Sequence, residues 1–247
     1  MRYCLIFEYD GKNYHGWQVQ PDSETVQQTI TKCLGDILNQ NIILIGAGRT
    51  DTGVNAKFMT AHFDCNCEIE TKEIKKKLNN YLPSDISIFK IVNVKNNFHA
   101  RFDAISRTYK YYIKQEKMPF KDRALLIKKE IDLDLMNEAC EKIIGRKDFT
   151  SFSKAHTQTH TNICEIYQAE WTCEKQIICF TIQANRFLRN MVRAIVGTML
   201  LVGEKKISPD EMTNIIKKKN RSFAGISVPA KGLFLVNIKY NEKDLLI

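Results

Sequence analysis

The hydrophobic pattern of this chain changes repeatedly between the alternation typical of strands and the three-to-four-residue spacing typical of helices. Val26, Ile30 and Leu34, for example, recur at the spacing of one helix face. This succession constrains the fold more than any other feature of the sequence. It predicts strands at 2–9, 41–46, 58–65, 86–94, 106–114, 164–173, 177–184 and 233–240, and helices at 25–38, 72–78, 132–144, 186–202 and 208–219.

Both halves of the 247-residue chain mix strands with helices, which favours an α+β architecture. The polar stretch at 95–103 is the best candidate boundary between them. We therefore expect an N-terminal half at 1–104 and a C-terminal half at 105–247. Because the stretch is short, the halves are expected to share a continuous sheet or a tight cleft.

The charge balance favours a polyanionic partner. The chain has 37 Lys and Arg against 28 Asp and Glu, a formal net charge of +9. Such an excess suits nucleic acid or an anionic membrane, although a lysine-rich solvated surface would give the same count. With 44% hydrophobic and 26% charged residues, the composition is that of a globular protein and not of a disordered one.

No apolar run reaches membrane-spanning length, and the first residues lack the order of a signal peptide, so a cytoplasmic location is expected. The eight cysteines contain no Cys-x-x-Cys pair, which favours free buried thiols. His156, His160 and Cys164 have ligand-like spacing, but a fourth ligand is missing. We therefore expect no bound metal.

The glycine-rich segment 46–56 follows the predicted strand at 41–46 and carries one carboxylate, Asp51, two residues after Arg49. Glycine permits positive φ and a close approach of the ligand. A carboxylate held near a cation suits an ionised nucleophile better than a proton donor. A tight structural turn is the alternative interpretation.

Residues 98–113 interleave aromatic and basic side chains. In a strand, Arg107 and Tyr109 take one face, whereas Lys110 and Tyr112 take the other. Such a surface could stack a base and hold its phosphates, although a tyrosine-rich core strand would have the same pattern.

Residues 185–197 carry three arginines. If the segment is helical, Arg186, Arg189 and Arg193 fall within an arc of about 60°, largely opposite the apolar side chains. The pattern predicts an arginine stripe on a helix, and an exposed basic face without a function is the alternative. Two shorter blocks, 14–27 and 229–236, have no clear chemistry of their own.

In chain order, these five blocks resemble the GWQxQP…TVQ, GRTDxGVHA, FHARFxAxxRxYxY, FLxxMVRxIVG and PAxGLxLV motifs of the TruA-type tRNA pseudouridine synthases, and together they span nearly the whole chain. The resemblance implies an α+β fold with an antiparallel sheet flanked by helices and a central active-site cleft between two related halves. It also implies a cofactor-independent homodimer that isomerises uridine to pseudouridine at positions 38, 39 and 40 in the anticodon stem-loop of tRNA.

Residue by residue, the resemblance makes Asp51 the nucleophile and Tyr109 the active-site tyrosine, which stacks on the uracil. Arg193 matches the arginine that faces the catalytic Asp, and together with Arg49 it would keep that carboxylate ionised. The residues expected to bind tRNA are Tyr109, Arg107, Arg186 and Arg189, with Lys75, Lys76 and Lys77 on the basic surface.

One position departs from the motif, since Asn55 stands where the family usually has His. An amide can form hydrogen bonds but cannot acquire a positive charge. Two functions of other classes remain as alternatives: a non-catalytic RNA-binding or chaperone protein on the same scaffold, and a zinc hydrolase that uses His156 and His160.

Overall fold

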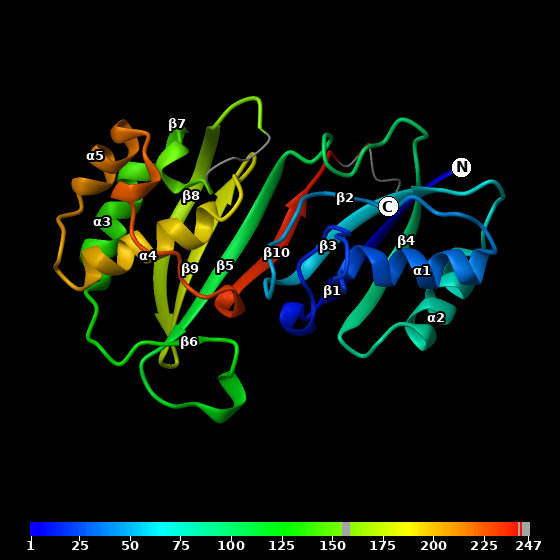
Figure 1. Ribbon diagram of the computed structural model, residues 1–247, viewed down its shortest axis with the longest axis horizontal. Coiled ribbons are helices and arrows are strands. Elements are labelled where there is room, and N and C mark those ends of the chain that lie inside the picture. Colours follow the sequence, from blue (N-terminus) through cyan, green and yellow to red (C-terminus); the bar gives the residue numbers. More distant parts are fainter. Residues whose placement is uncertain (155–158, 242, 244–247) are drawn as a thin grey trace. The chain divides into compact units, whose positions relative to one another are not determined.

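The computed structural model describes residues 1–154, 159–241 and 243, which fall into two compact units (Figure 1). The first unit comprises Met1–Ser106 with Leu235–Ile247, and the second comprises Arg107–Phe234. The boundary therefore falls at the start of β5 (Ser106–Lys114) and within β10 (Leu233–Lys239).

The sheet of the first unit is built around β1 (Arg2–Tyr9), which pairs antiparallel with β3 (Asn55–Asp64) on one side and β4 (Ile86–Val94) on the other. β2 (Ile45–Gly46) adds a short antiparallel pairing to β3. Successive side chains of β1 from Tyr3 to Phe7 are all buried, so both faces of this strand are covered. Because β1 is buried on both faces and pairs with β3 and β4, it fixes these two strands and the loops that end at them.

Two helices pack side by side in the first unit, α1 (Val26–Leu38) and α2 (Thr71–Tyr81), as Figure 1 shows. The side chain of Thr25 caps α1 by accepting a hydrogen bond from Gln28 N, and Asn39 ends the helix in the left-handed conformation. The buried face of α1 consists of Val26, Ile30, Cys33 and Leu34.

The sheet of the second unit has the order β5, β9 (Ile177–Ala184), β8 (Ile163–Glu174), β7 (Gly145–Asp148), and these neighbours are antiparallel. A two-residue strand, β6 (Leu125–Leu126), pairs parallel with β5. β8 and β9 form a hairpin whose turn residues, Lys175 and Gln176, both have positive φ. This is the geometry that a two-residue turn between twisted strands requires.

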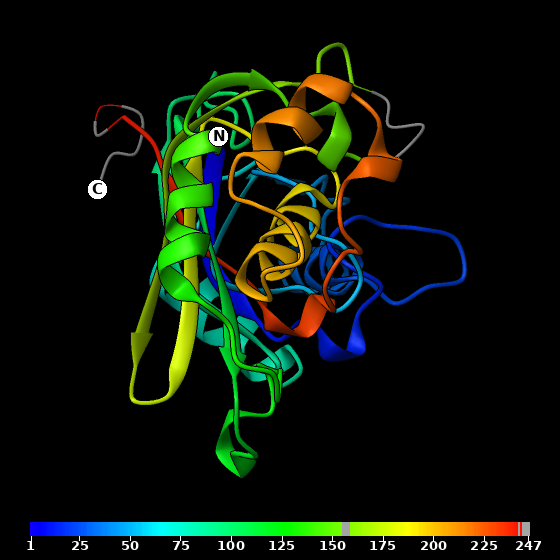
Figure 2. The same cartoon turned by 90° about the vertical axis from the view of Figure 1, so that its left-hand side faces the viewer.

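Three helices complete the second unit: α3 (Leu133–Ile143), α4 (Met191–Gly203) and α5 (Glu211–Lys218). α3 runs alongside the strands (Figure 2) and contacts both β8 and α4. Asn137 of α3 accepts a hydrogen bond from Trp171 N at 2.8 Å and donates one to Trp171 O at 3.1 Å. These bonds satisfy the backbone of β8 at a point beyond its pairing with β7.

Short 3-10 helices complete the two units. Their bounds are Gly11–Asn13, Pro119–Lys121, Thr150–Phe152, Arg221–Phe223 and Ala230–Gly232.

The α+β class, with antiparallel sheets flanked by helices, is confirmed, and the strands predicted at 2–9, 86–94, 106–114 and 177–184 are found at those bounds. The strand predicted at 41–46 is wrong for 41–44. Ile42 and Leu44 are buried and Ile43 is exposed, as in a strand, but these residues have no ladder partner. The carbonyl of Leu44 instead accepts a hydrogen bond from the side chain of Gln27 at 2.7 Å.

The helix predicted at 186–202 is also wrong at its N-terminal end, because α4 begins only at Met191. Asn190 has φ 69°, a left-handed conformation that an α-helix cannot contain in its interior. Arg186 and Arg189 therefore precede the helix, and only Arg193 lies on it. The predicted arginine stripe on one helix face does not exist.

Candidate active site

Asp51 lies in the loop between β2 and β3 of the first unit, where its side chain is half-buried and that of Arg49 is exposed. The loop is joined to β1 through Tyr9, whose hydroxyl lies 2.8 Å from the Thr50 hydroxyl. Val54 N donates to Asp51 O at 3.1 Å, which closes a tight turn just before β3 begins. The segment therefore forms the tight turn that was one interpretation of its sequence.

The N-terminal segment 11–17 forms the support of this loop. Trp17 N donates to Thr50 O at 3.2 Å, and Gly53 N donates to Tyr14 O at 3.3 Å. Gly16 has φ +89°, and a Cβ there would lie 2.5 Å from Thr50 O. Both the conformation and the close contact require glycine at this position. The Gly-Trp-Gln block, which had no clear chemistry of its own, is thus the scaffold of the Asp51 loop.

Trp17 also accounts for Gly46, the first glycine of the segment 46–56. A Cβ at Gly46 would lie 2.5 Å from the Trp17 indole, so the ring packs directly against the backbone of β2. By contrast, a Cβ at Gly48 would meet nothing within 4 Å. The glycines of this segment therefore differ in role: packing requires glycine at position 46 but not at position 48.

Asn55, the departure from the family motif, is 2% exposed. Its side-chain oxygen accepts a hydrogen bond from Gly11 N at 2.9 Å, which ties the supporting segment to the first residue of β3. Accepting this bond requires a lone pair and no positive charge. An amide in place of an imidazole is therefore compatible with this contact.

Tyr14 is fixed at the same support by Asp85, which accepts a hydrogen bond from its hydroxyl at 2.6 Å. Burial, and then the bond to Asp85, raise the pKa of Tyr14 well above its usual range. The hydroxyl therefore stays protonated and remains a donor at neutral pH. Sequence reasoning did not single out Asp85, because it lies more than thirty residues after the loop and belongs to no motif.

Tyr109 and Arg107 occupy the first part of β5 in the second unit. Arg107 Nη1 donates to Asn185 O at 2.8 Å, and the rings of Tyr109 and Phe187 are nearly perpendicular with centroids 5.2 Å apart. Arg107 and Ala184 are directly paired in the β5–β9 ladder, so the residues that follow β9 necessarily reach this end of β5. The sequence pattern assigned residue 187 to a helix at 186–202 and did not predict this contact.

Arg193 is half-buried in the first turn of α4, where it is bound to the segment that contains Val228. Arg193 Nε donates to Val228 O at 2.8 Å, and Val228 N donates to Arg193 O at 3.2 Å. Gly225 N donates to the Thr198 hydroxyl at 2.8 Å. At least one of the guanidinium donors is therefore used to hold the protein's own backbone.

The C-terminal motif, residues 229–236, packs against Tyr111, a fully buried residue of β5. Its hydroxyl donates to Pro229 O at 2.9 Å, and a Cβ at Gly232 would lie 2.7 Å from its ring. Burial raises the pKa of Tyr111, so this donor also stays protonated. The Pro-Ala-x-Gly block is thus a packing element that fixes the segment contacting Arg193.

The other predicted tRNA-binding residues are surface or edge residues. Arg186 is half-buried and Arg189 is exposed, in the connection between β9 and α4, and Lys154 N donates to Arg189 O at 3.1 Å. Lys77 of α2 forms an ion pair with Glu73 at 2.7 Å. The structure thus brings together Arg107, Tyr109 and Phe187 at one end of the second unit's sheet, while Asp51 and Arg49 belong to the first unit.

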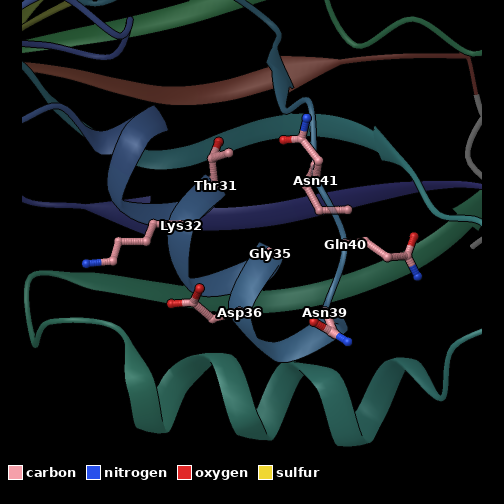
Figure 3. Close-up of a pocket in the computed structure, with 8 residues that line it drawn as sticks. Thr31, Lys32, Gly35, Asp36, Asn39, Gln40 and Asn41 are labelled. Atoms are coloured by element: carbon pink, nitrogen blue, oxygen red, sulfur yellow. The ribbon is translucent and has the colours of Figure 1, made fainter.

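A polar hollow lies elsewhere in the first unit, at the C-terminal end of α1 (Figure 3). No residue of the Asp51 loop contributes to it. It is lined by Thr31, Lys32, Gly35, Asp36, Asn39, Gln40, Asn41 and Ile42.

Within the described ranges, no three His, Cys, Asp or Glu side chains are grouped as metal ligands would be. His156 lies outside the described residues. Cys164 is fully buried, and burial raises the pKa of its thiol to about 11. All eight cysteines lie in the described part of the chain, and none is joined in a disulfide. None of the described helices is long and apolar enough to cross a membrane.

The chain has two mixed α+β units. One carries a glycine-rich loop with a carboxylate, and the other carries a cluster of arginine and tyrosine, as the five sequence motifs lead one to expect for an RNA-modifying enzyme. A family model described as tRNA pseudouridine synthase matches residues 5–103 and 139–241. The chain therefore belongs to the tRNA pseudouridine synthase family, an isomerase family, as its motifs predict.

Individual relatives support this assignment over nearly their full length. The protein named tRNA pseudouridine synthase A of Azobacteroides pseudotrichonymphae is 51% identical over 240 residues, which cover 97% of this chain and 96% of the relative. The Bacteroides fragilis protein of the same name is 50% identical over 245 residues, covering 98% and 97%. The one from Caldicellulosiruptor bescii is 41% identical over 239 residues, covering 96% and 98%.

Proposed function

We propose that this protein converts uridine to pseudouridine at positions 38, 39 and 40 in the anticodon stem-loop of tRNA, with Asp51 as the nucleophile. Family membership makes it an isomerase that forms pseudouridine in tRNA. The target positions and the roles of individual residues go beyond that membership. The observation that supports Asp51 best is its place on a glycine-rich loop held by backbone hydrogen bonds from residues 14–17.

In this reaction the bond between uracil N1 and the ribose C1′ breaks, and a bond between C5 and C1′ forms. The proton on C5 is lost and N1 gains one, so the product is an isomer of the substrate. Asp51 attacks the nucleotide covalently, which divides one difficult step into two easier ones. Chemistry on a base requires its extraction from the stack, and Tyr109 offers an aromatic ring on which the extracted uracil can lie.

The arginines have two tasks in this proposal. Arg49 and Arg193 orient the Asp51 carboxylate and stabilise the charge that develops during the reaction. Arg107, Arg186 and Arg189 hold the substrate, together with the basic surface that includes Lys75 and Lys76. Residues 1–104 thus carry the nucleophile, and residues 105–247 supply Tyr109 and Arg193 to the same reaction.

An enzyme that modifies three neighbouring positions cannot depend on the bases beside each target. We therefore propose that tRNA is recognised through its overall shape and backbone, for which scattered Lys and Arg are suited. Single-turnover rates should depend weakly on the flanking bases and strongly on truncation to an isolated anticodon stem-loop. A flanking-base effect larger than the truncation effect would contradict recognition by shape.

The direct test is incubation of the purified protein with unmodified tRNA, followed by mapping of pseudouridine. Product should appear at positions 38, 39 and 40 in molar excess over protein. A non-catalytic RNA-binding protein would bind tRNA and leave it unmodified. Chelator should leave the rate unchanged, because the proposed chemistry requires no metal; activity lost in EDTA and restored by zinc would contradict this.

Two properties complete the proposal: a homodimer and a cytoplasmic location. Both rest on the family resemblance, and a tRNA substrate agrees with the second. Sedimentation of the purified protein tests the dimer, and fractionation of cells that express it tests the location.

A further inference from the structure

Cys65 and Cys67 follow β3 in the first unit, and their sulfur atoms lie 3.7 Å apart. Cys65 is 2% exposed, whereas Cys67 is exposed. A disulfide needs an S–S distance of about 2.05 Å, so an approach of about 1.7 Å would join the two atoms. The pair therefore combines one accessible thiol with one sheltered thiol in contact with it.

The position of Cys65 is fixed by the N-terminus of the chain. Cys65 N donates to Met1 O at 2.9 Å, and the Met1 ammonium group donates to Cys65 O at 2.8 Å. Cys67, by contrast, lies in a bend outside any helix or strand. The approach of the two sulfurs thus requires movement of the exposed residue only.

Gln40, which follows α1 and lines the hollow of Figure 3, binds both thiols. Its amide nitrogen lies 3.5 Å from Cys65 Sγ and 3.6 Å from Cys67 Sγ. Its side-chain oxygen accepts from Asn66 N at 3.1 Å. The same oxygen lies 3.6 Å from Cys65 Sγ, where it can also accept from that thiol. The dithiol is therefore held in place by a polar side chain from another element.

We propose that Cys65 and Cys67 form a redox-active dithiol that is oxidised by the disulfides of small thiol compounds. The Cys67 thiolate attacks one sulfur of the small disulfide, forms a mixed disulfide and expels one small thiolate. Cys65 gives up its proton, attacks Cys67 Sγ and expels the second small thiolate. The dithiol loses two electrons and two protons, one small disulfide becomes two thiols, and a Cys65–Cys67 disulfide remains.

Cys173 of β8 is the internal control, because it is exposed but has no such neighbour. It pairs with Ile178 across the β8–β9 ladder, whereas Cys179 pairs with Thr172. Directly paired residues share a face and successive residues alternate, so Cys173 and Cys179 lie on opposite faces of the sheet. Cys173 can accept a small thiol but cannot resolve the mixed disulfide.

The experiment treats the full-length protein with oxidised glutathione and maps its cysteine peptides by mass spectrometry. The peptide with Cys65 and Cys67 should lose the mass of two hydrogen atoms, whereas Cys173 should retain glutathione. In Cys65→Ser, glutathione should stay on Cys67. Cys173→Ser should leave the Cys65–Cys67 disulfide unchanged, and Gln40→Ala should slow its formation several-fold.

Accumulation of glutathione on Cys67 of the wild-type protein, without closure to Cys65, would overturn the proposal. So would closure between Cys67 and any other cysteine. Because the wild-type result alone decides between these outcomes, the proposal stays testable even if Cys65→Ser does not fold. The test is independent of tRNA modification, since it reads mass and not activity.

Discussion

The Asp51 loop of the first unit and the Arg193 segment of the second are stabilised in different ways. The contacts around the Asp51 loop include backbone N–H to C=O bonds, such as that from Trp17 N to Thr50 O, and the close packing of Gly16. Around Arg193, the side chain itself holds the fold through Val228 O. The loop of the proposed nucleophile is thus held through backbone contacts, whereas the guanidinium proposed to assist it is also a structural donor.

This difference decides which substitutions separate catalysis from folding. A change at Asp51 removes a carboxylate and leaves the backbone bonds of the loop in place. A change at Arg193 removes a charge and a structural hydrogen bond together.

Asp51→Asn should reduce pseudouridine formation by more than about a thousandfold, because a neutral amide cannot act as the nucleophile. The melting temperature and tRNA affinity should change little, since the bond from Val54 N uses the Asp51 backbone. Single-turnover kinetics, thermal unfolding and a binding assay measure the three quantities. Near-normal turnover in this variant would refute the assignment of the nucleophile.

Arg193→Ala should lower turnover by about a hundredfold through the lost positive charge. It should also lower the free energy of unfolding by about 1 kcal/mol, because the bond to Val228 O disappears. Kinetics and denaturant unfolding on the same preparation test both effects. Arg189→Ala, on an exposed residue that precedes α4, is the control. Equal kinetic defects in the two variants would contradict the special role of Arg193.

Gly16→Ala should destabilise the first unit by about 2 kcal/mol, since alanine at φ +89° is strained and its Cβ would press on Thr50 O. Turnover should fall as well, because Thr50 precedes the nucleophile. Gly48→Ala is the matched control, because a Cβ at this position of the Asp51 loop meets nothing within 4 Å. If both variants unfold at the same denaturant concentration, the support from residues 11–17 is not what fixes the loop.

Acid should destabilise the first unit through His62. Burial, followed by the charges of Arg2 and His99, lowers the pKa of His62 to about 4, while Asp64 and Asp103 oppose this shift. Its Nδ1 accepts a hydrogen bond from Ala100 N at 3.1 Å, which only a neutral imidazole can do.

The unfolded chain binds a proton at His62 below about pH 6.5, whereas the folded protein resists protonation down to about pH 4. The stabilisation is therefore complete above pH 6.5 and is lost as the pH falls towards 4. Melting temperatures across this range should fall less steeply in His62→Gln than in wild type. His15→Gln, at an exposed histidine, should keep the wild-type slope.

The smallest effect is expected at Arg189, an exposed residue of the connection between β9 and α4. Arg189→Ala should weaken tRNA binding modestly and flatten its dependence on log salt concentration by about one unit for each lost phosphate contact. Binding isotherms at several salt concentrations give the slope. An unchanged slope would remove Arg189 from the proposed tRNA-binding surface.

Much of the fold was readable from local pattern. Alternation predicted β1, β4, β5 and β9 at their observed bounds, and apolar spacing predicted α1 to within one residue of its start. These elements depend on short-range periodicity and on side-chain chemistry that a few neighbouring residues determine. The ordered motifs likewise predicted the family.

The failures have one physical origin, in contacts between residues far apart in the sequence. Residues 41–44 alternate like a strand, but the ladder partner is missing and Gln27 takes its place at Leu44 O. The arginine pattern at 186–193 fits a helix, yet Asn190 adopts φ 69° and its side chain donates to the Ser227 hydroxyl. Hydrogen bonds that form only in the folded chain overruled a locally plausible pattern in both cases.

Periodicity and ordered motifs were therefore sufficient to predict the α+β class, the family and the candidate residues Asp51, Tyr109 and Arg193. The folded chain was needed to reveal that the Gly-Trp block supports the Asp51 loop and that Arg193 holds Val228 O. It alone also brought Cys65, Cys67 and Gln40 together. Backbone pairing and the approach of distant segments fix such contacts, and no local pattern encodes them.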